Sequence, residues 1–101
     1  MNIGEISQKA DLPTKTVRYY ADVGLVKPTG RSNAGYRTYD EKALRKLIFV
    51  RRSRAMGFSV QECRKLLSLY EDQGRASSEV REIAKQHLVE INAKLSELNK
   101  L

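Results

Sequence analysis

The sequence has few residues of the kinds that build metal sites, catalytic centres or covalent cross-links. It contains one cysteine, Cys63, and one histidine, His87. A single cysteine excludes an intrachain disulfide and fits a reducing, cytoplasmic compartment. No Ser-His-Asp arrangement, metal-ligand spacing or glycine-rich phosphate loop is present, so we do not expect an enzyme. Cys63 falls on the apolar stripe of a predicted helix, which indicates a buried structural thiol.

Long hydrophobic runs are also missing. No apolar stretch approaches the roughly 18 residues that a transmembrane helix needs. Residues 1–5 have neither the basic nor the apolar region of a secretory signal. With 101 residues, 41% of them hydrophobic, we expect one small domain with an appended helix rather than two independent cores.

Positive charge is plentiful and unevenly distributed. The chain has a net charge of +7, and residues 1–54 hold 12 of its 19 Lys and Arg and only 5 acids (12 − 5 = +7). Residues 55–101 carry 7 bases and 7 acids and are neutral overall. A basic surface on one half of a chain favours a polyanionic partner, either nucleic acid or anionic lipid.

The first 23 residues have the pattern of two short helices joined by a tight turn. Ile3, Ile6 and Ala10 are at helical spacing, and the segment 11–14 interrupts them. In residues 15–23, Val17 and Tyr20 share one face, and the other face carries Lys15, Arg18, Tyr19 and Asp22. Gly24 ends this second helix. The sequence therefore predicts a helix-turn-helix at about residues 3–23.

Residues 26–39 predict a β-hairpin wing. Pro28, Gly30 and Gly35 exclude a helix there, and the segment 36–39 is rich in strand formers. Asp40 is a suitable N-cap for a helix at about 41–56, and Ser59-x-x-Glu62 is a capping box for another at about 60–71. These two connector helices complete a predicted DNA-binding domain of residues 1–71.

The last segment, residues 77–101, predicts a long dimerisation helix. From residue 78 onward it has no Gly or Pro, and its apolar positions alternate by four and three in the heptad pattern of a coiled coil: Ala84, Leu88, Ile91, Leu95 and Leu98. Because the chain has no second long helix, we expect a second copy as the partner. The predicted fold is thus mainly α: a winged helix-turn-helix with a small β-hairpin wing, a two-helix connector and a long C-terminal coiled-coil dimerisation helix.

The basic residues of the second helix and of the wing have the chemistry of DNA recognition. Arginine binds guanine in a bidentate way, and Lys, Thr and Tyr reach bases or phosphates. We expect Tyr20 to belong mainly to the core, and Tyr36 either to pack against the helices or to contact DNA. The predicted DNA-binding residues are Lys15, Thr16, Arg18 and Tyr19 in the helix, Arg31, Tyr36, Arg37 and Tyr39 in the wing, and Arg52 and Arg54 as backbone contacts.

Several of these segments together resemble the MerR family of bacterial transcription activators. The resemblance runs from residue 1 to about residue 90 and rests mainly on Thr16–Tyr20 and Gly35–Tyr39, with Ile3–Ile6, Gly24–Val26 and Phe58–Ser59 in support. Asp11 stands where relatives often have Gly, and Pro13 where they often have a Ser or Thr cap. We expect Asp11 to adopt a left-handed conformation and the cap to move to a neighbouring residue.

The resemblance implies a dimer on double-stranded promoter DNA whose two promoter elements are too far apart or out of phase. Effector binding would let the dimer bend and untwist the spacer so that RNA polymerase engages both elements. Ser77 stands where the metal-sensing branch typically has Cys for divalent ions and Ser for monovalent copper, silver or gold, and the surrounding sequence looks most like the copper-efflux regulators. Ser77 is equally suited to be a plain helix N-cap.

Two thiolates for Cu(I) or another monovalent metal should follow the dimerisation helix, after residue 101. No metal ligand is expected within this chain, and it needs no other cofactor. Two alternatives stay open. One is a MerR-type regulator with a drug, redox or other metal effector. The other is a coiled-coil adaptor whose basic half binds an acidic protein, which the arginines of the second helix and the wing argue against.

Overall fold

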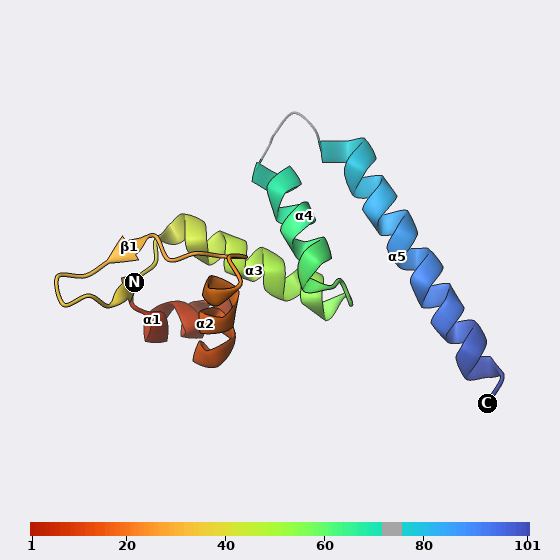
Figure 1. Ribbon diagram of the computed structural model, residues 1–101, viewed down its shortest axis with the longest axis horizontal. Coiled ribbons are helices and arrows are strands. Elements are labelled where there is room, and N and C mark those ends of the chain that lie inside the picture. Colours follow the sequence, from red (N-terminus) through yellow and green to blue (C-terminus); the bar gives the residue numbers. More distant parts are fainter. Residues whose placement is uncertain (72–75) are drawn as a thin grey trace. The chain divides into compact units, whose positions relative to one another are not determined.

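The computed structural model describes residues 1–71 and 76–101, without the side chains of residues 76 and 77. The chain is mainly helical with one small antiparallel hairpin, as the sequence predicts (Figure 1). The elements are α1 (Ile3–Ala10), α2 (Thr14–Asp22), β1 (Gly30–Arg31), β2 (Arg37–Thr38), α3 (Glu41–Ala55), α4 (Val60–Glu71) and α5 (Ala76–Asn99). Two compact units, Met1–Cys63 and Arg64–Leu101, divide within α4. The domain boundary at residue 71 stays a prediction.

Local signals set the limits of α1 and the turn after it. The side chain of Asn2 accepts a hydrogen bond from the Glu5 amide (2.8 Å), and the Glu5 side chain accepts one from the Asn2 amide (3.4 Å), which is a capping box. Asp11 ends the helix in the left-handed conformation, with φ 57°. The prediction for Asp11 is therefore confirmed.

The start of α2 differs from the expectation. Pro13 occupies the N-cap position in an extended conformation, and no side chain caps the helix. The prediction that the cap moves to a neighbouring residue is wrong, because proline itself takes that position and has no side-chain acceptor. Its fixed φ still suits the entry to a helix, and its carbonyl accepts the first helical hydrogen bond, from the Val17 amide (3.1 Å).

The core of the first unit forms where α1 contacts α2 and α3. Its largest fully buried side chains come from these three helices, from the segments that flank the wing and from the start of α4: Ile6, Val17, Val26, Tyr39, Leu47, Val50 and Cys63. Tyr20 is 5% exposed, so its predicted place in the core is confirmed. The core fixes α2 by its apolar face, which leaves the opposite face of that helix at the surface.

The wing is a short hairpin held at its base by backbone hydrogen bonds. Strands β1 and β2 pair with Gly30 opposite Thr38 and Arg31 opposite Arg37. At the tip, Gly35 has φ 86°, a conformation that favours glycine. At the base, the Tyr39 amide donates to the Met1 carbonyl and the Met1 ammonium donates to the Tyr39 carbonyl, each at 2.7 Å. These bonds fasten a hairpin that is too small to be stable alone.

Both predicted caps of the connector helices are present. The Asp40 carboxylate accepts a hydrogen bond from the Ala43 amide (2.9 Å) at the start of α3. This bond lowers the pKa of Asp40 below its ordinary value. Before α4, the Ser59 amide donates to the Glu62 carboxylate (2.8 Å) and the Glu62 amide donates to the Ser59 hydroxyl (3.0 Å). These two bonds confirm the capping box.

In the second unit, α5 has a buried face and an exposed apolar stripe. Ile83 and His87 are buried. Leu88, Leu95 and Leu98, which belong to the predicted coiled-coil seam, are 58%, 52% and 62% exposed. Of the other predicted seam residues, Ala84 is exposed and Ile91 is half-buried.

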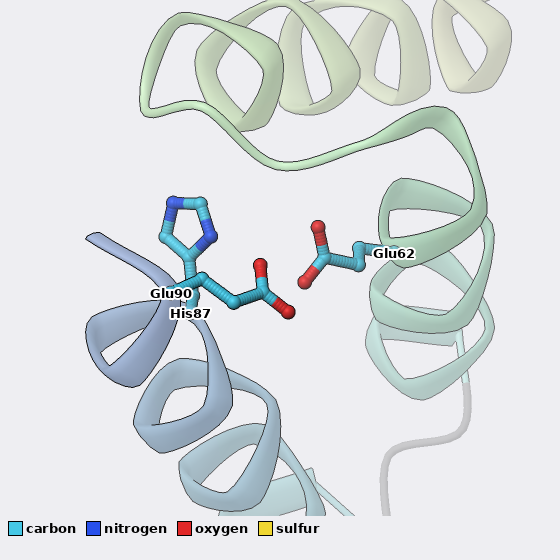
Figure 2. A group of neighbouring side chains, drawn as sticks. All are labelled: Glu62, His87 and Glu90. Carbon is cyan, nitrogen blue, oxygen red and sulfur yellow. The ribbon is translucent and has the colours of Figure 1, made fainter. Parts of the chain in front are cut away.

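Figure 2 shows His87 and Glu90 one turn apart on α5, and Glu62 in the first turn of α4. Glu62 belongs to the first unit and the other two residues to the second.

Candidate nucleic-acid interface

Helix α2 turns a basic and aromatic face to the surface. Val17 and Tyr20 anchor the helix in the core. On the opposite face, Lys15 and Arg18 are exposed, and Tyr19 is 49% exposed. Thr16 is half-buried. An exposed helical face with arginine, lysine and tyrosine can supply both base and phosphate contacts.

The wing presents three of its four predicted contact residues. Tyr36 is 74% exposed, so the alternative in which it packs against the helices is wrong. Arg31 is exposed, and its Nη1 donates to the Gly35 carbonyl (2.9 Å) across the hairpin. Arg37 is half-buried. Their guanidinium and phenol groups are accessible donors for phosphate oxygens.

Tyr39 is a correction to the predicted interface. Only 1% of it is exposed, so it belongs to the core and has no surface with which to contact DNA. Burial raises the pKa of its hydroxyl above the ordinary value, and the nearby Arg37 guanidinium opposes this shift. The physical reason is alternation along an extended chain, because side chains one residue apart point to opposite faces. Tyr36 and Tyr39 are three residues apart in an extended segment, so they point to opposite faces, and Tyr39 lies on the face that packs into the core.

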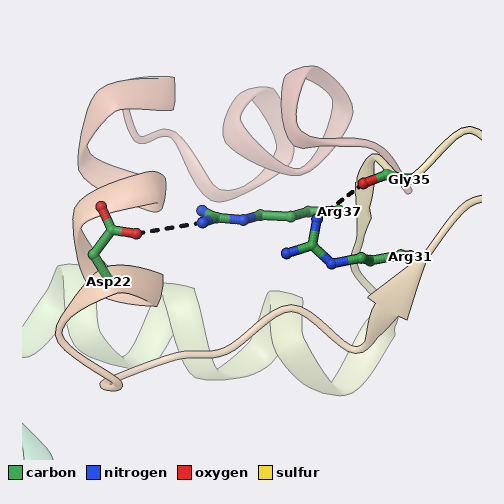
Figure 3. A network of polar contacts seen from close by, with 4 residues as sticks. All are labelled: Asp22, Arg31, Gly35 and Arg37. Atoms are coloured by element: carbon green, nitrogen blue, oxygen red, sulfur yellow. Dashed lines mark hydrogen bonds and ion pairs between the residues drawn. The ribbon is translucent and has the colours of Figure 1, made fainter.

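Helix α2 and the wing border a common hollow of about 650 Å³. Arg18 reaches it from α2, and Arg31, Tyr36 and Arg37 reach it from the wing. Asp22, at the end of α2, is the one acid in the described lining, and its Oδ1 lies 3.3 Å from Nη2 of Arg37. Figure 3 shows the Arg37 side chain extending from the wing to Asp22, beside Arg31. Three guanidinium groups in one concave surface favour an anionic ligand.

Six residues that line this hollow were not among the predicted DNA contacts, namely Asn2, Ile3, Asp22, Ser32, Gly35 and Thr38. Only Asp22 carried a usable signal, since it falls four residues after Arg18 on the exposed face of the predicted helix. The predicted backbone contacts Arg52 and Arg54 lie elsewhere, on α3. Both are exposed, and Nη1 of Arg54 donates to the Phe58 carbonyl (2.8 Å).

Comparison with known proteins agrees with this geometry. The model of the MerR HTH family regulatory proteins matches residues 1–70, and the model named MerR, DNA binding matches residues 44–101. The chain belongs to the MerR family.

Individual MerR-family relatives match over the whole chain. The chain is 54% identical to the HTH-type transcriptional regulator HmrR of Rhizobium leguminosarum bv. viciae over 101 residues, which cover 100% of the chain and 78% of that protein. It is 39% identical to the HTH-type transcriptional regulator CueR of Salmonella typhi, with 100% and 73% covered.

Among solved structures, the regulator PbrR691 from Ralstonia metallidurans CH34 in complex with lead(II) is similar at a TM-score of 0.88 and 38% identity. This match covers 98% of the chain and 77% of that protein. Together the matches establish a MerR-type DNA-binding transcription regulator, which is not an enzyme.

The residues present in this MerR-family chain do not fit a binding site for a soft monovalent metal. Such ions prefer thiolate ligands, and Cys63 is fully buried in the core of the first unit. Burial raises the pKa of its thiol, which disfavours the thiolate. The backbone of Ser77 lies in the first turn of α5, but its side chain lies outside the described part of the chain.

None of the helices in residues 1–71 and 76–101 combines the length and apolar character of a membrane span.

Proposed function

We propose that this chain is a dimeric promoter-binding regulator that distorts DNA and activates copper-efflux genes. The observation that carries the proposal is the shared basic hollow. Arg18 of α2 and Arg31 and Arg37 of the wing line one concave surface. In this arrangement α2 enters the major groove and the wing follows the adjacent backbone. Lys15, Thr16 and Tyr19 extend the contact along α2, and Arg52 and Arg54 add backbone contacts from α3.

The exposed stripe on α5 supports the dimer. Leu88, Leu95 and Leu98 are each more than half exposed on a single helix. A second copy of the helix would cover them, with Ala84 and Ile91 completing the heptad pattern. Two recognition helices would then be held at a fixed spacing, so the DNA site would consist of two half-sites. Bending and untwisting the DNA between them would allow RNA polymerase to engage both promoter elements.

The choice of effector rests on the relatives and on Ser77. The HTH-type regulator CueR is 39% identical over the whole chain. Ser77 stands at the position where the metal-sensing branch typically has serine for monovalent ions. A different metal is the second candidate, because the similar PbrR691 structure contains lead(II). The one thiol of this chain, Cys63, is buried, so these 101 residues alone would not supply the thiolates for such a metal. A regulator of this kind acts where the chromosome is, so we place it in the cytoplasm.

Salt-dependent DNA binding tests the central claim. Operator DNA and random duplex DNA of equal length are titrated with the protein at several salt concentrations. We expect operator binding to persist at salt concentrations where random binding is lost, because counterion release supplies essentially all of the non-specific affinity, whereas base contacts add to the operator affinity. An adaptor that binds acidic partners would lose both DNAs together. The effector is tested with a protein that also carries the two thiolates expected after residue 101. A base-unstacking fluorophore in the promoter spacer reports the distortion as Ag(I), Cu(I), Pb(II) and Zn(II) are added to the complex in turn.

A further inference from the structure

Asp22 occupies an unfavourable position for a negative charge. It is the last residue of α2, where the helix dipole disfavours a carboxylate. It also lies in the hollow that three arginines line and that would receive DNA phosphates. A carboxylate there repels the phosphate backbone. Both effects oppose an acid at this position, so its presence requires a compensating interaction.

The compensating interaction is with Arg37. Oδ1 of Asp22 lies 3.3 Å from Nη2 of Arg37, and the two residues are 15 positions apart in the chain. The pair joins the end of α2 to strand β2, the two elements that border the hollow (Figure 3). Only one guanidinium nitrogen is engaged with the carboxylate. Arginine has five N–H donors in a planar fork. The Tyr39 hydroxyl is a second neighbour of this guanidinium, and the donors that face the hollow can bind a phosphate.

Stability does not explain the pair. The Asp22 side chain is 64% exposed and the Arg37 side chain 32% exposed. Exposed ion pairs of this kind contribute little to folding, because water and salt screen them and both side chains lose freedom. The larger effect is on Arg37 itself. The pair restricts a long side chain to one orientation before DNA arrives, and this ordering is then no longer a cost of binding. Arg31 is restricted in the same way by the Gly35 carbonyl.

We infer that Asp22 is a positioning residue for DNA binding: its carboxylate holds the Arg37 guanidinium in the hollow and ties the wing to the recognition helix. This inference rests on the proposed DNA-binding function. It predicts a change in DNA affinity opposite in direction to the change that simple electrostatics predicts. Removing a negative charge from a DNA-binding surface should strengthen binding, whereas removing a positioning carboxylate should weaken it. If the Asp22 carboxylate merely competed with phosphate for Arg37, its removal would make DNA binding tighter.

A double-mutant cycle separates these possibilities. Operator affinity is measured by fluorescence anisotropy for the parent, Asp22→Asn, Arg37→Ala and the double variant. Asn keeps the size of the side chain and removes its charge. We expect Asp22→Asn to weaken operator binding about two- to tenfold, the effect of leaving one long side chain unrestrained. In the Arg37→Ala background, the same substitution should no longer weaken binding.

Asp11→Asn is the matched control. It removes one negative charge from another exposed position of the same unit, and asparagine tolerates the left-handed conformation found there. We expect it not to weaken binding. Thermal unfolding should be nearly the same for Asp22→Asn and the parent.

Three outcomes overturn the inference. Binding by Asp22→Asn that is unchanged or tighter would refute the positioning role. An equal loss with and without Arg37 would place the effect of Asp22 elsewhere. A parent protein that does not distinguish the operator from random DNA would refute the proposed function and this inference with it. That result is recognised from the parent alone, before any variant is compared.

Discussion

Replacement of Leu95 by glutamate tests whether the exposed stripe of α5 holds two copies together. Leu95 is 52% exposed, so about half of its surface remains to be buried by a partner. Full burial of a leucine side chain contributes about 1.5–3 kcal/mol, so the two copies in a dimer lose about 2 kcal/mol when it is replaced. A glutamate carboxylate inside the apolar seam adds a desolvation cost of at least about 2 kcal/mol.

The two effects sum to at least about 4 kcal/mol, which raises the dissociation constant of the dimer about a thousandfold. Sedimentation velocity at micromolar concentration should therefore show a dimer for the parent and a monomer for Leu95→Glu. Operator affinity should fall in parallel, because a monomer contacts only one half-site. Val89→Glu is the matched control, since Val89 is 61% exposed on the same helix but lies off the stripe.

A parent protein that sediments as a monomer at micromolar concentration would refute the coiled-coil dimer and the two-half-site mechanism built on it. Dissociation by Val89→Glu with a dimeric Leu95→Glu would instead move the interface to another face of α5.

Four further predictions concern single residues. Arg18→Ala should lower operator affinity by about 1–3 kcal/mol and relax base preference at one position per half-site, because an arginine on the recognition helix reads a base. Binding selections with randomised half-sites measure the base preference. An unchanged preference would show that Arg18 does not read a base. Arg37→Ala should weaken binding to all sequences alike and reduce the salt slope by about one, because it contacts phosphate; a loss restricted to the operator would instead mean that the wing reads bases. The stabilising effect of the Asp40 cap should be complete above the ordinary carboxyl pKa of about 3.9 and should be lost as the pH falls through the lowered pKa in the folded protein. Urea unfolding between pH 7 and pH 2 should therefore show a shallower acid loss for Asp40→Asn, and equal pH profiles would contradict this. The Cys63 thiol, buried and with a raised pKa, should react with iodoacetamide far more slowly in the native protein than in denaturant, and equal rates would show that the first unit opens readily.

Local chemistry accounts for the elements that could be predicted from the sequence. Residues 3–10 were expected to be helical and form α1. Asp40 and the Ser59–Glu62 capping box open α3 and α4 as expected. Each signal acts within a few residues, because a cap bonds amides of the next turn and a glycine or aspartate adopts a left-handed conformation where it stands. Such signals are present in the sequence before any tertiary contact forms.

Tertiary structure decided which aromatic side chains of the wing face outward. Tyr36 and Tyr39 both lie in a segment rich in strand formers, and both were predicted to contact DNA. Tyr36 is 74% exposed and Tyr39 is 1% exposed. Alternation along the strand separates the two faces, but which face packs on the helices depends on how the hairpin is fastened. That is decided by the hydrogen bonds between Tyr39 and Met1, which are 38 positions apart.

The sequence alone determined that the chain would have a basic helix-turn-helix, a wing and a long amphipathic helix, because charge and hydrophobic spacing are properties of neighbouring residues. The folded structure was needed to show that Oδ1 of Asp22 lies 3.3 Å from Nη2 of Arg37. It was also needed to show that Arg18, Arg31 and Arg37 line the same hollow. The physical reason is that an ion pair between two elements requires their relative placement. The core of the first unit sets that placement through buried residues such as Val17, Val26 and Tyr39.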